Sequence, residues 1–286
     1  MLPRLPASCL ALLLLVASCG SPPEQPSSEE PSPEASIQTY YAASGHAPPF
    51  SRTPYERFRR SEAVGIAVQE WQLFGKPVND DPPGSRGEPD PLDHPARQPG
   101  HWQRIGEYWW LGQNSNRREA AWTGMHDENG TEFDARREDF YAWSAAFISY
   151  VMRTAGAGPR FPYAPSHYIY INVAANMTQG RTSGWAIYAE RPESYAPKVG
   201  DLICSSRERR PVKYRQLPLR RFAGHCDIVV ATAPGQLSVI GGNVADAVTM
   251  KHVPVTTDGM LATPDGEVLD GRYPWFVVIR VAYDGP

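Results

Sequence analysis

Cysteine is scarce in this chain, and the histidines are scattered. The 286 residues contain four cysteines and seven histidines, and neither a CxxC pair nor an HExxH motif occurs. His94 and His101 lie in a proline-rich segment with no cysteine beside them. Structural zinc sites are usually built from paired motifs of this kind. The sequence therefore predicts no metal site.

An excess of basic charge is also lacking. The chain has 28 basic and 31 acidic side chains, and loss of residues 1–18 would remove only Arg4, leaving 27 basic side chains, or a net charge of −4. Proteins that bind nucleic acids neutralise phosphates with clustered Lys and Arg. The charge balance therefore gives no support for a nucleic-acid partner.

No apolar run near the start is long enough to span a bilayer. The run at residues 10–17 has only eight residues and follows Arg4, which is the pattern of a signal peptide. The VAS sequence before Cys19 resembles the lipobox of bacterial lipoproteins, in which the cysteine is lipidated. Gly20, rather than Asp, favours the outer membrane facing the periplasm by the same analogy. The alternative is an ordinary signal peptide in which Cys19 is incidental.

Residues 19–52 contain few apolar groups and many Pro, Ser and Glu. Such a composition cannot bury enough surface to offset the entropy of ordering. We expect a disordered tether here, which would hold the remaining residues off the membrane. Residues 53–286 then form one domain large enough for a sizeable core.

Residues 53–75 have the pattern of a helix. Thr53 is placed as the N-cap, Pro54 as the first helical residue, and Glu56 completes a capping box. Gly75 ends the segment. The apolar residues near helical spacing are Ala63, Ile66, Ala67, Trp71 and Phe74. Both flanks are proline-rich, so we expect this apolar face to pack on the domain.

Aromatic residues gather in residues 104–112, which we expect to be short and partly extended. Trp109 and Trp110 are candidates either for the core, which we favour, or for a sugar-binding groove. The preceding residues 76–100 are polar and rich in Pro, Gly and Asp, which predicts a long surface excursion.

A helix is predicted from Ala142 to near Gly156, with Ser144 in its first turn. A second short helix is expected at residues 168–175. The chain then becomes β-rich, with strand patterns at residues 199–206, 224–232, 236–244, 247–255 and 275–283. Helices first and strands later predict an α+β domain, with a helix packed on an antiparallel sheet.

Four motifs occur in a particular order: WSAAFISYVMRTAG, GDLI, GHCDIVV and GGNV. Together they resemble the papain-like cell-wall hydrolases, including the CHAP amidases and NlpC-type peptidases. Within that superfamily the chain most resembles the bacterial domain-of-unknown-function family 2272, from residue 53 to the last strand, including FPYAPSHYIYI. The resemblance implies a papain-like fold, in which a nucleophile-bearing helix packs on the sheet, and it implies no cofactor.

The resemblance also implies roles for individual residues. Ser144 stands where the family has a nucleophilic cysteine, His225 takes the place of the general base, and Asn243 the place of the group that orients it. Asp227 is the alternative orienting group, because it lies two residues from His225 and on the same face of a strand. Trp143 and His167 are expected to line the cleft, although a loop histidine is more often structural.

Cys204 and Cys226 fall on two strands that the superfamily pairs antiparallel. The resemblance therefore implies a disulfide between them, as an oxidising compartment would permit. Cys226 should point away from the face that carries His225.

The serine leaves two functions open. A helix N-terminus can help to lower the pKa of a thiol, but a serine hydroxyl depends on a base that removes its proton during attack. The chain is therefore either an amide hydrolase of peptidoglycan or a related envelope component, or a pseudo-enzyme that binds wall peptides or a protein partner. The arginine-rich residues 207–222 form either a solvated insertion or a grip on carboxylates or phosphates.

Overall fold

The structure is a computed structural model that describes residues 57–82, 85, 94–113 and 117–285. The expected signal peptide, the lipidation residue Cys19 and the tether lie outside the described residues. Within the described part of the chain, no helix is both long and apolar enough to cross a membrane.

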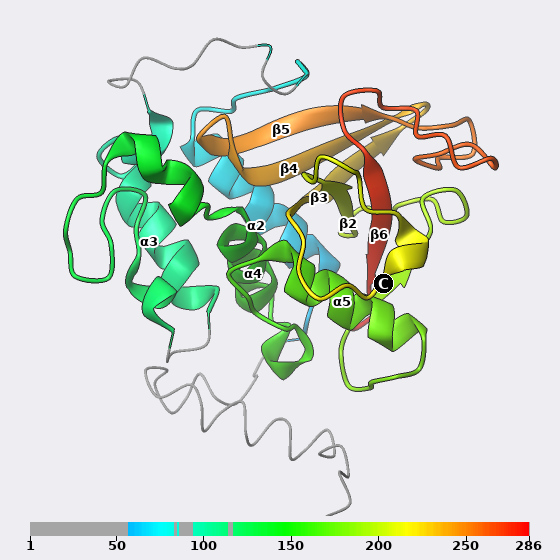
Figure 1. The fold of residues 1–286 in the computed structure, drawn as a ribbon, viewed down its shortest axis with the longest axis horizontal. Helices are drawn as coiled ribbons and strands as arrows, with labels where there is room; N and C mark the ends of the chain where they lie inside the picture. The colour runs from blue at the N-terminus through cyan, green and yellow to red at the C-terminus, as the bar shows by residue number, and fades with distance from the viewer. Residues whose placement is uncertain (1–56, 83–84, 86–93, 114–116, 286) are drawn as a thin grey trace, which may run out of the picture.

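Helical elements come first and strands follow (Figure 1). The longer helices are α2 (Arg60–Leu73), α3 (His101–Leu111), α4 (Ser144–Thr154) and α5 (His167–Thr178). Short 3-10 helices are η2 (Pro95–Arg97), η3 (Arg118–Ala121), η4 (Ala135–Tyr141), η5 (Gly158–Arg160) and η6 (Tyr214–Gln216). The strands are β1 (Ile187–Glu190), β2 (Leu202–Ser206), β3 (Gly224–Ala233), β4 (Gln236–Val244), β5 (Ala247–Pro254) and β6 (Trp275–Val281).

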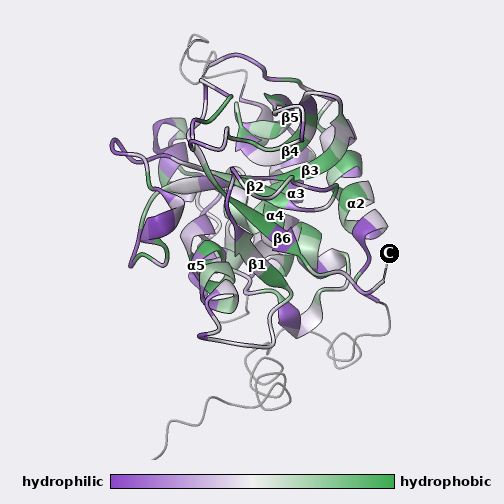
Figure 2. Ribbon diagram, turned by 90° about the vertical axis from the view of Figure 1, so that its right-hand side faces the viewer, coloured by the Kyte–Doolittle hydropathy of each residue, from purple (hydrophilic) through white to green (hydrophobic). Residues whose placement is uncertain are grey.

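The strands form one antiparallel sheet in the order β1-β6-β2-β3-β4-β5. Helices α2, α4 and α5 pack on this sheet, and Cys204, Ile228 and Ile240 of the sheet join the helices in the larger hydrophobic core. Figure 2 shows hydrophobic residues along β3 and β6 and hydrophilic residues on the outer loops. The expected α+β class and antiparallel sheet are confirmed.

The alternate residues of the same strands form a second, smaller core. It contains Ile203, Val229, Val239 and Val278, with Leu261 from the segment between β5 and β6. A strand presents successive side chains to opposite faces, so β2 and β3 are apolar on both sides. Asp227 and Lys251 lie two residues from Val229 and Val253, so they share the face of the sheet that carries this second core.

Helix α2 begins later than the capping pattern predicts. Thr53, Pro54 and Glu56 lie outside the described residues, and the helix starts at Arg60. The backbone N–H of Phe58 donates to Asp284 Oδ2 at 3.0 Å, and the N–H of Asp284 donates to Phe58 O at 2.8 Å. These bonds hold the residues just before α2 in a non-helical conformation. Ala63, Ala67 and Phe74 are buried as expected.

The prediction of an extended segment at residues 104–112 is wrong, because α3 is helical. Ile105, Tyr108 and Trp109 are buried at helical spacing, and Gln103 accepts a bond from the N–H of Gly100 at 2.7 Å. The apolar face of a helix therefore outweighs the β propensity of its aromatic residues. Trp109 belongs to the core, whereas Trp110 is 48% exposed.

A buried carboxylate joins α2, α3 and α4. Glu70 is 1% exposed, and its carboxylate accepts bonds from Arg104 Nε at 2.8 Å, Tyr108 Oη at 2.6 Å and Tyr150 Oη at 3.1 Å. Arg104 Nη2 also pairs with Glu70. This network fixes α4, and with it Ser144, relative to the other helices.

The strand predictions were close, but β1 was missed, and β2 begins at Leu202 rather than at residue 199. The GD motif explains the later start. Asp201 is buried and accepts bonds from Tyr195 Oη and the N–H of Lys198, both at 2.9 Å, and from the N–H of Val281 at 3.0 Å. Its role is therefore to anchor the turn before β2 to β6.

Part of the predicted surface excursion lies along the edge of the sheet. Val78 forms a bridge with Met250 of β5, and the N–H of Asn79 donates to Met250 O at 2.9 Å. Asp80 accepts from the N–H of His252 at 2.7 Å. These contacts pair the outer edge of β5 with residues 78–80.

Candidate active site

Ser144 is the first residue of α4 and lies in the wall of a cleft. Its hydroxyl does not cap its own helix; instead, Ser144 Oγ lies 2.7 Å from His167 Nε2. The first helical hydrogen bond runs from the N–H of Phe147 to Trp143 O at 3.0 Å, so the amides of Ser144 and Ala145 have no acceptor within the helix. Free amides and the helix dipole favour negative charge at this point.

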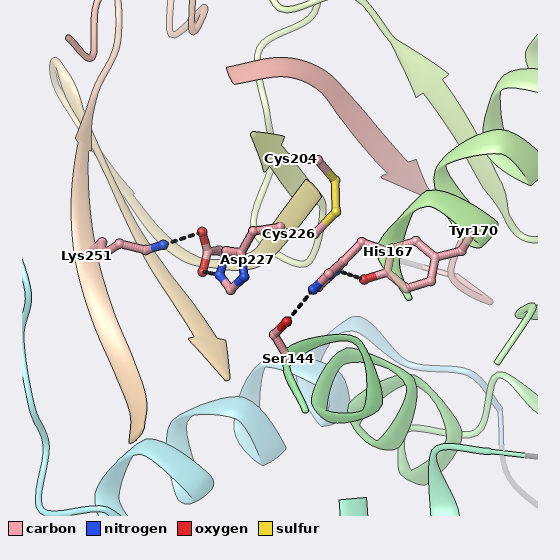
Figure 3. The surroundings of a disulfide bond; sticks show 8 residues. Ser144, His167, Tyr170, Cys204, Cys226, Asp227 and Lys251 are labelled. Carbon is pink, nitrogen blue, oxygen red and sulfur yellow. Dashed lines mark hydrogen bonds and ion pairs between the residues drawn. A yellow bond between two sulfur atoms is a disulfide. The ribbon is translucent and has the colours of Figure 1, made fainter. Parts of the chain in front are cut away.

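His167 is the first residue of α5, which directs its ring towards the start of α4 (Figure 3). Its Nδ1 is hydrogen-bonded to the hydroxyl of Tyr170, one helical turn later. Burial, and then the neighbouring His225 and Arg207, hold the pKa of His167 well below its usual range. His167 is therefore neutral at pH 7, and only one of its two ring nitrogens carries a hydrogen.

The hydrogen bonds around Tyr170 decide which nitrogen carries that hydrogen. Tyr170 is fully buried, burial raises its pKa well above the usual range, and within the described residues its hydroxyl bonds only to His167 Nδ1. If Tyr170 donates to Nδ1, His167 carries its hydrogen on Nε2 and donates to Ser144. The other tautomer leaves the Tyr170 hydrogen unpaired, at a cost of about 1–3 kcal/mol. At rest, His167 is therefore a donor to Ser144.

A second histidine lies beside the first. The rings of His167 and His225 have centroids 5.2 Å apart. His225 is buried and does not line the cleft. Its Nε2 lies 3.0 Å from Asp227 Oδ1, while its Nδ1 is buried without a hydrogen-bond partner among the described residues. Burial lowers the pKa of His225 to about 4, so this ring is also neutral at pH 7.

Asp227 connects His225 to a buried lysine. Lys251 Nζ lies 2.7 Å from Asp227 Oδ2, and the two side chains are 1% and 0% exposed (Figure 3). Burial opposes ionisation of Asp227, but Lys251 and His225 outweigh it and hold its pKa below the usual range. Asp227 is thus a carboxylate that accepts the Nε2 hydrogen of His225, which leaves His225 Nδ1 with a bare lone pair.

Two glycines of the GGNV motif make room for these groups. A Cβ on Gly241 would lie 1.8 Å from Asp227 Oδ1, and one on Gly242 would lie 2.7 Å from Trp143 Cζ3. Glycine is needed at both positions because of these close approaches. The motif therefore serves the packing of Asp227 on one side of β4 and of Trp143 on the other.

Three expected positions need correction. The imidazole that contacts Ser144 is His167, not His225, because α5 carries His167 to the start of α4. Asn243 lines the cleft but makes no hydrogen bond to His225, whose Nε2 faces Asp227 instead. Trp143 is 3% exposed and packs in the core against Phe74 and Tyr108 rather than lining the cleft.

Cys204 and Cys226 are joined by a disulfide with a Cα–Cα distance of 4.1 Å. They are directly opposite each other in β2 and β3, and both belong to the core beneath the helices. Cys226 lies between His225 and Asp227 on β3, so these two side chains point to the opposite face from the disulfide. The disulfide fixes β3 at this point to β2.

The cleft has a volume of about 1060 Å³. Besides Ser144 and His167, its wall includes Arg136, Arg207 and Asn243. Arg207 is exposed and belongs to the arginine-rich residues 207–222. Of these described residues, only Arg207 and Phe222 line the cleft. The cleft also contains His94, Glu138 and Asp246. Burial, and then the charge of Glu138, raise the pKa of Asp246 to about 7.

Comparison with known families gives one match. A family described as an uncharacterized protein conserved in bacteria, DUF2272, matches residues 96–281. The chain belongs to the DUF2272 family. No curated protein and no solved structure matches it. The DUF2272 region contains Ser144, His167, His225 and Asp227, but it begins after α2, later than the resemblance from residue 53 to the last strand implied.

Sequence reasoning missed two residues of the DUF2272 site. Tyr170 follows His167 by three residues, a spacing that places both on one face of a helix. Lys251 lies on the same inward face of β5 as Thr249 and Val253. A lysine at such a position usually has a buried counter-charge. Both patterns are present in the sequence, but neither predicts that Tyr170 bonds to His167 or that Lys251 pairs with Asp227.

Proposed function

We propose that this DUF2272 protein is a papain-like serine hydrolase of amide bonds in peptidoglycan or a related envelope component. The observation that supports it best is the 2.7 Å contact between Ser144 Oγ and His167 Nε2 in the wall of a large cleft. A nucleophile, an imidazole in hydrogen-bond reach and a helix N-terminus are the parts that acyl transfer requires.

In this proposal Ser144 Oγ attacks the carbonyl carbon while His167 Nε2 accepts its proton. The free amides at the start of α4, including that of Ala145 in the cleft wall, donate to the developing oxyanion. The C–N bond then breaks as His167 returns the proton to the leaving amine. A water molecule deprotonated by His167 releases the acyl group from Ser144 in the same way. Asp227, paired with Lys251, holds His225 beside His167.

Two side chains of the cleft suit a substrate carboxylate, although Asp134, Glu138, Asp139 and Asp246 line the cleft as well. Arg207 and Arg136 line it, and a guanidinium binds a carboxylate through two parallel hydrogen bonds. The peptides of peptidoglycan carry such groups. We therefore assign Arg207 to substrate binding, and we expect Arg207→Ala to raise KM more than it lowers kcat.

The test is release of peptide fragments from purified sacculi by the full chain. We expect Ser144→Ala and His167→Gln each to abolish release, and His225→Gln to reduce it only in part. Asp258→Asn, at an exposed residue outside the cleft, is the control. Activity that survives Ser144→Ala in a folded protein would refute the serine mechanism, and loss with His225→Gln but not with His167→Gln would make His225 the base.

Tyr170→Phe tests the tautomer directly. His167 must carry its hydrogen on Nδ1 to act as a base, and in the wild type that tautomer costs about 1–3 kcal/mol because it leaves the Tyr170 hydrogen unpaired. Removing the hydroxyl leaves Nδ1 unpaired in both tautomers, which narrows this difference, so hydrolysis should become faster, by up to about tenfold. A decrease would mean that Tyr170 supports the productive tautomer, or that His167 only donates to Ser144.

A pseudo-enzyme that binds wall peptides is the second candidate. It is favoured by the small exposure of Ser144, which is 6%, and by the resting tautomer, in which His167 donates to Ser144 rather than accepting from it. In that case wild type and Ser144→Ala would both bind sacculi and release nothing, whereas Arg207→Ala would bind less.

A further inference from the structure

We propose that His94, Glu138 and Asp246 form a binding site for a divalent first-row metal ion in the same cleft as Ser144. The three residues come from separate parts of the chain: the segment before η2, η4 itself, and the turn between β4 and β5. One ligand atom from each lies within 4.8 Å of the other two. The proposal is independent of whether Ser144 is catalytic.

The distances between the atoms fit a common central ion. His94 Nδ1 lies 3.1 Å from Glu138 Oε2 and 3.4 Å from Asp246 Oδ2. Ligands about 2.0–2.1 Å from a tetrahedral Zn²⁺ ion are about 3.3 Å from one another. The two distances from His94 therefore agree with ligands that surround one ion, and the two carboxylates each offer an oxygen within 4.8 Å of the other.

The directions of the groups also favour an ion over a simple hydrogen bond. Although His94 Nδ1 is close to two carboxylates, it is buried and has no hydrogen-bond partner among the described residues. The contacts are short enough for ion pairs with both carboxylates, but their geometry is poor for a hydrogen bond to either oxygen. Donor atoms that converge on a shared point rather than on each other are the arrangement of metal ligands.

The charge of the cluster is poorly compensated without an ion. The side chains of Glu138 and Asp246 are 22% and 10% exposed. Arg97 Nη1 is 3.8 Å from Glu138 Oε1, but its guanidinium makes its closer bonds to Glu132 at 2.6 Å and to Phe133 O at 3.1 Å. Asp246 Oδ2 accepts from the N–H of Ala96 at 3.2 Å. A divalent cation would balance both carboxylates.

The ligand set indicates which metal ions would bind. One imidazole and two carboxylates suit Zn²⁺ or Mn²⁺, whereas Ca²⁺ and Mg²⁺ prefer oxygen ligands alone. Three protein ligands leave at least one position for water or substrate, as in catalytic zinc sites. Since all three residues line the cleft, that position would be open to a carboxylate or carbonyl oxygen of a bound molecule. This inference departs from the sequence analysis, which predicted no metal.

The test is calorimetric titration of Zn²⁺ into the full chain after chelator treatment and with the disulfide intact. We expect one ion per chain, with a Kd in the micromolar range or below. Asp246→Asn and His94→Gln should each weaken binding at least tenfold. Asp258→Asn removes an equal charge from an exposed residue outside the cleft and should leave the affinity unchanged.

Circular dichroism and the Tm of each variant separate loss of the site from loss of the fold. If one variant does not fold, Glu138→Gln replaces it, and the wild-type titration still decides the main point. Wild-type protein that binds no Zn²⁺ or Mn²⁺ below about 1 mM would overturn the proposal. Equal affinity in wild type and Asp246→Asn would also overturn it, because the ion would then be bound elsewhere.

Discussion

Replacing Lys251 with methionine should destabilise the protein by about 3–5 kcal/mol, because it removes one partner of a buried ion pair. Lys251 Nζ lies 2.7 Å from Asp227 Oδ2, and neither side chain reaches solvent to any useful extent. His225 is neutral at pH 7, with a pKa of about 4. The variant would therefore leave the Asp227 carboxylate without a cationic partner.

Two considerations set the size of this loss. A carboxyl with a usual pKa near 3.9 can be protonated at pH 7 for about 4 kcal/mol, which limits what an unpaired Asp227 can cost. Lys251 Nζ also lies 4.8 Å from the centroid of the Tyr273 ring and 5.6 Å from that of Trp275. Loss of these cation–π contacts adds up to about 2 kcal/mol, which the thioether of methionine partly recovers by packing on the rings.

The assay is urea unfolding at pH 7 of wild type, Lys251→Met, Asp227→Asn and the double variant, with the disulfide intact. The double variant should regain at least about 2 kcal/mol over the sum of the single losses, because it buries no unpaired charge. The Lys251→Met deficit should shrink as pH falls towards 4, where protonation of Asp227 becomes easy. Single losses below about 1 kcal/mol, or additive losses, would refute the ion-pair reasoning.

Other predictions concern the neighbours of this pair. Because the pKa of His225 is about 4 when folded and about 6.5 when unfolded, the unfolded chain takes up the proton first. His225 should therefore lower stability by up to about 3 kcal/mol as pH falls from 6.5 to 4, and urea titrations of His225→Gln should lack this loss. Replacing both Cys204 and Cys226 with alanine, which opens a loop with a sequence separation of 22, should cost about 3 kcal/mol of unfolding free energy; an unchanged urea midpoint would contradict it. Gly241→Ala would place a methyl group 1.8 Å from Asp227 Oδ1, so we expect a lower Tm by circular dichroism and reduced sacculus cleavage, whereas the exposed Gly235→Ala probes only the strain of its left-handed backbone.

The sequence predicted elements better than the contacts between them. Short apolar runs bounded by turn residues predicted β3, β4 and β5 almost to the residue, since the sheet has a core on each face. The position of Ser144 at a helix start was equally readable, because the apolar stripe begins there. Helix α3 was misjudged because its aromatic residues have high β propensity, and only the packing of Tyr108 and Trp109 on neighbouring elements decides for a helix.

The histidine beside Ser144 could not be identified from local patterns. His167 and His225 are separated from it by 23 and 81 residues, and which of them reaches the hydroxyl depends on how α5 packs on the sheet. Similarly, Asp227 accepts from His225 because Gly241 makes room for the carboxylate. The spacing of two residues on one strand face suggests Asp227 as the alternative partner of His225, but the choice between Asp227 and Asn243 depends on the tertiary structure, which local patterns do not reveal.

The pairing of residues 78–80 with β5 has a consequence for how copies of this protein behave when crowded. An exposed strand edge is a template on which another molecule can add a strand and begin a growing assembly. Here the two neighbours of Val78 already use the backbone groups of Met250 on the outer edge of β5: Met250 N–H donates to Pro77 O, and the N–H of Asn79 donates to Met250 O. At the opposite edge, β1 has only four residues. The sheet therefore offers little to a neighbouring copy. A protein that loses the pairing at Val78, for example by cleavage within residues 76–82, should polymerise edge to edge while its two cores are still folded.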